Sequence, residues 1–181
     1  MLYVTNTNTN SMPARTMPGM RYKMAYTTMY ELLPALAKNE TRTLTIFDNN
    51  VYNLPPGDYG LVEMYCNDKG CDCRRVFFNV MSSVTRDSVA VIAYGWESRG
   101  YYAKWYCGDW LDVSELNGEI LDTVKSLKGP CLNLMSPQSK IAPLVLKMVS
   151  EFLEHDKAYI DRLKRHYKLF RAKVDAMYAH A

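Results

Sequence analysis

Three of the five cysteines in the sequence, Cys66, Cys71 and Cys73, fall within eight residues of one another. Cys71 and Cys73 are two residues apart, so on an extended chain their side chains project from the same face. The intervening Asn-Asp-Lys-Gly at 67–70 is typical of a turn, which can fold Cys66 back towards the other two. Zinc is bound by thiolates that converge on one point. The pattern therefore predicts a metal site made by Cys66, Cys71 and Cys73, with zinc as the expected ion.

Charged residues around this motif are expected to support the metal site. If the flanking strands pair symmetrically, Cys66 lies opposite Cys73, and Glu63 and Arg74 become diagonal neighbours within reach of a salt bridge. A surface ion pair worth about 0–1 kcal/mol is the alternative for those two residues. Arginines directly after the motif would offset the negative charge of a thiolate cluster. The residues expected to surround the metal are Glu63, Asp68, Asp72, Arg74 and Arg75.

Two other interpretations of the same cysteines stay open. Small cysteines in a tight turn also pack as ordinary buried residues. Neighbouring arginines lower the pKa of a thiol, which would suit a redox sensor or a thiol-based enzyme. The spacing does not identify a fourth metal ligand, although the candidates with suitable chemistry are Cys107, Cys131, His155, His166, Asp68 and Asp72.

Four segments have the alternating or β-branched pattern of strands, at residues 42–47, 59–66, 73–81 and 88–94. Short loops rich in turn-forming residues connect them, which favours an antiparallel meander over β-α-β units. The cysteine motif then lies at the tip of the hairpin between the second and third of these strands.

Helical spacing of apolar residues occupies most of the rest of the chain. It predicts helices at residues 24–38, interrupted by Pro34, and at 113–127, ended by Gly129-Pro130. Two more follow, one starting at Pro143 and a long final one capped by Asp156. Residues 96–110 are ambiguous.

The expected fold is therefore α+β, an antiparallel β-meander packed by C-terminal helices. Residues 1–20 have no periodicity and predict a disordered or loosely attached leader. Residues 21–181 predict a single α+β domain, in which 39–95 are mainly strands and 111–178 mainly helices.

The positive charge of the chain is concentrated in its last helix. The whole chain carries a net charge of +3, yet from Tyr159 onwards six Lys and Arg face two Asp, a balance of +4. The predicted basic face comprises Arg162, Lys164, Arg165, Lys168 and Arg171. Three interpretations compete: a helix that packs its apolar seam on the sheet, a homodimer formed through that helix, and a nucleic-acid-binding adaptor.

Other functional classes find little support in the sequence. No apolar run approaches the ~18 residues that a membrane span requires, and the first twenty residues lack a secretory apolar core, so we expect a cytoplasmic protein without a membrane partner. Nucleotide-binding glycine loops and the common hydrolase motifs are absent. We therefore expect a structural zinc domain that serves interaction rather than catalysis.

Three short motifs together resemble a prokaryotic protein family that has no assigned activity. The resemblance covers about residues 40–175 and implies no mechanism, although it makes the cysteine hairpin the expected functional centre. Cys107 and Cys131 fall outside its pattern. The residues that carry it are Glu63, Tyr65, Cys66, Asp68, Cys71, Asp72, Cys73, Arg74, Arg75 and Val76; Leu132, Pro137, Gln138, Ser139, Ala142, Pro143 and Leu144; and the run from Arg162 to Arg171.

Overall fold

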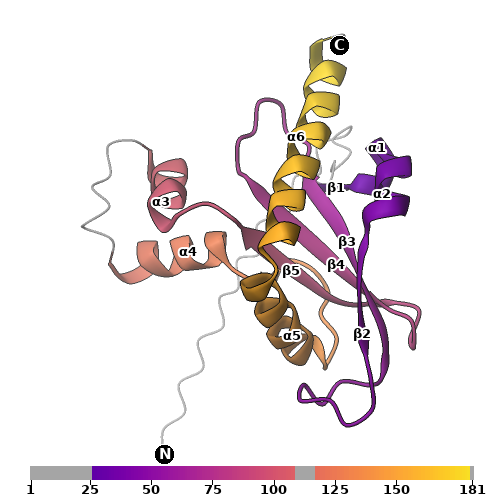
Figure 1. The fold of residues 1–181 in the computed structure, drawn as a ribbon. Coiled ribbons are helices and arrows are strands. Elements are labelled where there is room, and N and C mark those ends of the chain that lie inside the picture. Colours follow the sequence, from indigo (N-terminus) through magenta and orange to yellow (C-terminus); the bar gives the residue numbers. More distant parts are fainter. Residues whose placement is uncertain (1–25, 109–116, 180–181) are drawn as a thin grey trace, which may run out of the picture.

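An antiparallel sheet with helices against one of its faces forms the framework of the computed structural model, which describes residues 26–108 and 117–179 (Figure 1). The α+β class, with a meander packed by C-terminal helices, is confirmed. The predicted leader at 1–20 lies outside the described residues. The strands are β1 (Tyr26–Thr28), β2 (Arg42–Ile46), β3 (Gly57–Cys66), β4 (Arg75–Ser82), β5 (Ser88–Gly95) and β6 (Cys131–Leu132). The helices are α1 (Met29–Leu32), α2 (Pro34–Glu40), α3 (Arg99–Cys107), α4 (Gly118–Lys128), α5 (Ala142–His155) and α6 (Lys157–Ala179).

Strand β3 organises the sheet. One of its edges pairs with β4, and the other is divided between two shorter strands. β2 pairs with the first half of β3, and β1 pairs with its last three residues, where Tyr26 lies opposite Cys66. The meander continues through β5 to the two-residue strand β6. The end of β3 therefore lies between β1 and β4, and it delivers Cys66 into the loop that follows.

Alternate side chains of β3, β4 and β5 point to opposite faces of the sheet, as the strand period of two requires. One face packs against α5 and α6, and its residues include Tyr59, Leu61, Tyr65, Val76, Phe78, Val80 and Ile92. The other face carries a smaller apolar cluster of Phe77, Val91 and Ala93, joined by Tyr26, Met64 and Cys131.

The helices begin and end close to the proline and capping residues that predicted their boundaries. Pro34 is the first residue of α2 and separates it from α1, while Pro143 is the second residue of α5 rather than its first. Asp156 caps α6 by accepting a hydrogen bond from Tyr159 N at 2.8 Å. Ser98 caps α3 in the ambiguous segment. Within the described ranges, no helix has both the length and the apolar content that crossing a bilayer demands.

Candidate metal centre

The loop between β3 and β4 brings the three predicted sulfur atoms together. The Sγ atoms of Cys66, Cys71 and Cys73 all lie within 4.8 Å of one another, and all three cysteines are free thiols. Sulfurs that share a tetrahedral ion at about 2.3 Å would be separated by about 3.8 Å, so only a small contraction is needed. Cys66 and Cys73 are buried, whereas Cys71 is half-buried. The cluster could therefore hold a metal ion, reached from the side of Cys71.

The sulfurs converge through a different strand register from the predicted one. The β3–β4 ladder pairs Met64 with Phe77 and ends there, which makes the symmetric pairing of Cys66 with Cys73 wrong. The chain needs the longer loop because it reverses in steps: Cys71 N donates to Asp68 O at 3.3 Å, and Gly70 has a φ of 66°. Left-handed backbone of this kind favours glycine.

Helix α6 holds the backbone of this loop at several points. Nη1 of Arg171 donates to Cys66 O at 3.0 Å and to Asp68 O at 2.9 Å. Tyr167 donates its hydroxyl to Cys71 O at 3.2 Å, and Tyr178 donates to Asn67 O at 3.3 Å. These bonds occupy carbonyl groups between the cysteines, so the sulfurs are positioned from outside the loop.

Helix α3 holds the other side of the loop. The hydroxyl of Tyr101 donates to Asp72 O, and that of Tyr102 donates to Arg74 O at 2.8 Å. Tyr102 is fully buried, so its position is fixed by core packing. The arrangement of the three sulfur atoms is thus set by two helices, α3 and α6, that lie far apart in the sequence.

The three thiols share hydrogen bonds that concentrate negative charge on Cys71. Hydrogen bonds from the Cys66 and Cys73 thiols hold the pKa of Cys71 well below its usual range, and the guanidinium of Arg171 acts in the same direction. The pKa of Cys66 is raised, chiefly by its interaction with Cys71, and the pKa of Cys73 is raised by its interactions with the other two sulfurs and by burial. Cys71 is therefore the first of the three thiols to lose its proton, and Cys66 and Cys73 keep theirs to higher pH.

Of the residues predicted to surround the sulfurs, Asp68 is the one in direct contact. Its Oδ2 accepts a hydrogen bond from Cys66 Sγ at 3.5 Å. Asp72 and Arg74 form an ion pair with each other at 2.9 Å, and Arg74 also reaches Glu97 at 3.3 Å. They stiffen the outer side of the loop rather than touching the metal ligands.

The predicted salt bridge between Glu63 and Arg74 is wrong. Arg75 is buried on the face of the sheet opposite α6, where its guanidinium donates to Ser126 O. Glu63 pairs in the ladder with Phe78 and has no salt bridge to Arg74. The predicted diagonal contact depended on the symmetric register, which does not form.

Glu63 instead belongs to a buried polar network beneath α6. Its Oε2 lies 2.8 Å from Nδ1 of His166 and accepts a hydrogen bond from Tyr65 at 2.6 Å, and its Oε1 accepts one from Tyr159 at 3.4 Å. Nε2 of His166 lies 3.1 Å from Glu40. Burial by itself would lower the pKa of His166, but the hydrogen bonds and charges of Glu63 and Glu40 outweigh it and raise that pKa.

This network has a signal in the sequence, although the spacing of apolar residues does not reveal it. Glu63 occupies an inward-facing position of an alternating strand, and a carboxylate there requires a buried partner. His166 lies next to the apolar seam of the last helix and is that partner.

None of the other fourth-ligand candidates within the described residues joins the sulfurs. His166 is engaged with Glu63, and His155 contacts Glu151 O. Cys131 donates to Ser126 O, and Cys107 ends α3. Asp68 remains the intramolecular candidate, because it is exposed and already adjoins Cys66.

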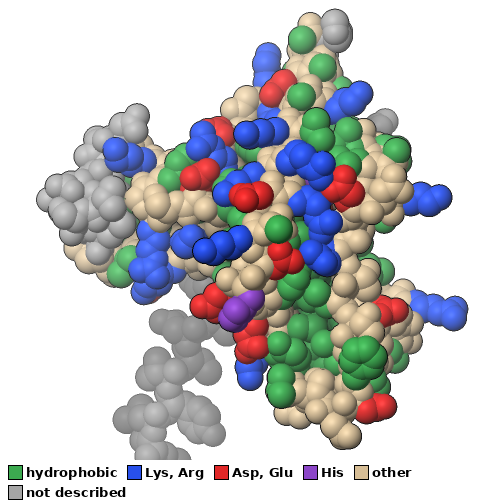
Figure 2. Space-filling view, viewed as in Figure 1, with side chains coloured by type: hydrophobic (Ala, Val, Ile, Leu, Met, Phe, Trp, Pro, Cys, Tyr) green, Lys and Arg blue, Asp and Glu red, His purple; other side chains and the backbone are tan. Residues whose placement is uncertain are grey.

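The basic face of α6 is smaller than predicted. Figure 2 shows Lys and Arg side chains along this helix, interspersed with Asp and Glu. Lys164, Arg165 and Lys168 reach the surface, but Arg165 pairs with Glu40. Arg171 is buried in the cysteine loop, and two nitrogens of Arg162 are buried, so neither belongs to an open basic face. The apolar seam of α6 packs within the core of its own chain.

Comparison of the chain with protein-family models, curated proteins and solved structures finds no match. The site's chemistry therefore rests on its own geometry.

Proposed function

We propose that the protein binds one zinc ion through Cys66, Cys71 and Cys73 and uses the metal-bound loop as an interaction surface. The observation that carries this proposal is the convergence of the three sulfurs on a loop whose backbone is already held by α3 and α6. Preorganised thiolates suit zinc and other soft ions, because the ligands need little further ordering when the metal arrives.

The charge of the site also supports zinc. Three thiolates around Zn²⁺ leave one net negative charge, and the buried guanidinium of Arg171 next to the loop offsets it. A fourth position stays available to Asp68, to water or to a side chain of a partner. Three protein ligands with an open position allow exchange at the metal.

The surroundings of the loop favour contact with another molecule over catalysis. Its tip at Asp68, Lys69 and Gly70 is exposed. Two surface hollows flank it, one lined by Asp72, Arg74, Trp96 and Tyr167 and the other by Asn67, Val174 and Met177. The Glu63–His166 pair, which could act as an acid and a base, is sealed from solvent.

Elemental analysis of protein purified without chelator, together with its intact native mass, tests the metal proposal. We expect about one zinc per chain in the wild type and in Cys107→Ser, and none in Cys71→Ser. The Cys107 variant is the matched control, since that thiol lies outside the cluster. Equal metal content in all three proteins would refute the assignment.

A redox thiol is the second candidate, and the lowered pKa of Cys71 favours it. Metal-free protein as purified, with rapid alkylation of Cys71 at neutral pH, would support this alternative in place of zinc.

A further inference from the structure

We propose that a hollow on the sheet face opposite α6 binds a small organic carboxylate with an apolar body, and that Arg75 is its anchor. None of Cys66, Cys71 and Cys73 lines this hollow, although Tyr26, which does, lies opposite Cys66 in the sheet. It lies between the sheet, α4 and the segment after β6, and its volume is about 850 Å³. Pockets for small molecules commonly have this size.

Arg75 is a buried cation with no counterion among the residues that the structure describes. Its side chain is only 8 % exposed, and it forms no ion pair with any described carboxylate. The other buried arginine of the described ranges, Arg171, pairs with Asp175. Burying an unpaired charge is costly, so a charge at this position calls for a partner that the described fold does not supply.

The guanidinium of Arg75 also has unused hydrogen-bonding capacity. Of its five N–H donors, one reaches a protein acceptor, the carbonyl oxygen of Ser126 at 3.3 Å. Its Nε is buried without a partner, and its Cζ lies 5.1 Å from the centre of the Phe77 ring. The guanidinium is therefore held in place by stacking on Phe77 and by one weak hydrogen bond to Ser126 O. Arg75 lines the hollow.

The walls of the hollow define the rest of the ligand. Tyr26 and Phe77 pack with their ring centres 3.9 Å apart, and Leu127 and Leu132 add aliphatic surface. Thr123 and Ser126 of α4 also line the hollow. One guanidinium in an apolar setting can neutralise one negative charge, and its planar fork matches a carboxylate. A monoanionic carboxylate with an aromatic or branched body fits this combination, whereas a phosphate dianion would stay half neutralised.

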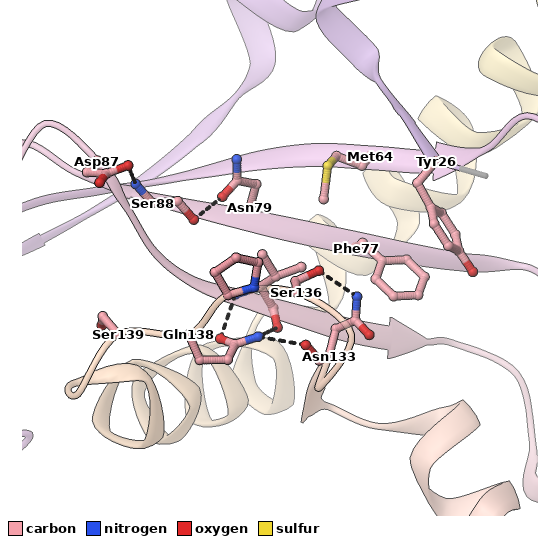
Figure 3. Close-up of a pocket in the computed structure, with 12 residues that line it drawn as sticks. Tyr26, Met64, Phe77, Asn79, Asp87, Ser88, Asn133, Ser136, Gln138 and Ser139 are labelled. Carbon is pink, nitrogen blue, oxygen red and sulfur yellow. Dashed lines mark hydrogen bonds between the residues drawn. The ribbon is translucent and has the colours of Figure 1, made fainter. Parts of the chain in front are cut away.

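A second hollow of about 510 Å³ adjoins the first and shares Tyr26, Phe77, Asn133 and Ser136 with it. In Figure 3 these residues lie along one channel, with Met64 and Asn79 on the strands and Gln138 on the facing segment. Gln138 bonds the backbone N–H and C=O of Val91, which keeps that segment fixed against β5. The ligand body can extend into this channel from Arg75.

The chain before β1 cannot provide the missing charge. Residues 1–25 contain no Asp or Glu. The carboxylates of Asp109, Asp112 and Glu115 lie outside the described residues, and the experiment decides between them and an external anion.

Isothermal titration of the full chain with 4-phenylbutyrate, and with the neutral 4-phenylbutyramide as matched probe, tests the proposal. We expect the acid to bind at least tenfold more tightly than the amide, and Arg75→Met to remove that difference. Lys173→Met, which alters an exposed lysine on α6, should leave binding unchanged. Thr123→Trp, which fills the hollow from its rim and keeps Arg75, should abolish binding of both probes.

Thermal unfolding separates a binding role of Arg75 from a structural one. Without ligand, Arg75→Met should melt at the same temperature as the wild type or higher, because it removes an unpaired buried charge. The proposal is overturned if the wild type binds neither probe. A carboxylate of the same chain that already pairs with Arg75 would give this result. It is equally overturned if the amide binds as well as the acid, or if Arg75→Met lowers the melting temperature.

Discussion

Arg171→Met tests whether the fold preorganises the cysteine loop. Besides the ion pair with Asp175, the change removes two charge-assisted hydrogen bonds to the loop, to Cys66 O and Asp68 O, that are together worth about 3–6 kcal/mol. Part of this energy is lost from the metal-free loop as well, and Tyr167 still holds Cys71 O. We therefore expect the loss seen in metal affinity to be about 10–100-fold, equivalent to about 1.4–2.7 kcal/mol.

Competition for zinc with a chromophoric chelator at fixed pH measures this loss. Lys173→Met is the matched control, because it removes a positive charge from the exposed side of the same helix. The control should retain wild-type affinity if position, rather than net charge, is what matters. If Arg171→Met binds zinc as tightly as the wild type, the loop is not preorganised by α6 and the reasoning is refuted.

Three further predictions concern the buried network and the thiols. Glu63→Gln should destabilise the fold by about 3–5 kcal/mol, or lower the melting temperature by about 6–20 °C, because it breaks the buried pair of Glu63 with His166. The surface substitution Glu154→Gln is the control and should not change the stability. Because the pKa of His166 is raised in the folded state, its contribution to stability is fully present below the unfolded pKa of 6.5 and is lost as the pH rises through the folded pKa. Melting curves of the wild type between pH 6 and 9 should show this decline in stability. The same curves of His166→Asn should not. Zinc affinity, measured by chelator competition, should rise by about 100-fold per pH unit around neutrality, because the thiols of Cys66 and Cys73 have raised pKa values and must each release a proton. An affinity that does not change with pH would contradict the raised pKa values of these two thiols.

The clustering of the three cysteines could be predicted from the sequence because its signals are local. Cys71 and Cys73 lie two residues apart, and Gly70 supplies the reversed backbone that brings Cys66 near them. Local spacing has no information about strand register, which is set by how whole strands pack. The predicted contact that depended on register, between Glu63 and Arg74, therefore does not form.

The residues that hold the loop could not be found from local patterns. Tyr101, Tyr167 and Arg171 are separated from the cysteines by tens of residues, and tyrosine and arginine are common on surfaces. Only the packing of α3 and α6 turns their polar tips towards the loop carbonyls. The apolar seam of α6 predicted the helix but not its inward-facing polar residues.

Helix α6 links the stability of the core to the geometry of the site. Within two turns it contributes His166 to the buried pair, Phe170 to the core and Arg171 to the loop. The three sulfurs consequently converge only in the folded chain, so the proposed zinc ion would bind the native state and add to its stability by mass action. The core also affects the site. A substitution that weakens the packing of α6 in the core, such as Glu63→Gln, also weakens the hydrogen bonds from α6 to the carbonyl groups of the loop. Metal affinity should then be sensitive to core substitutions that touch no ligand, which distinguishes this loop from small zinc motifs that the metal itself folds.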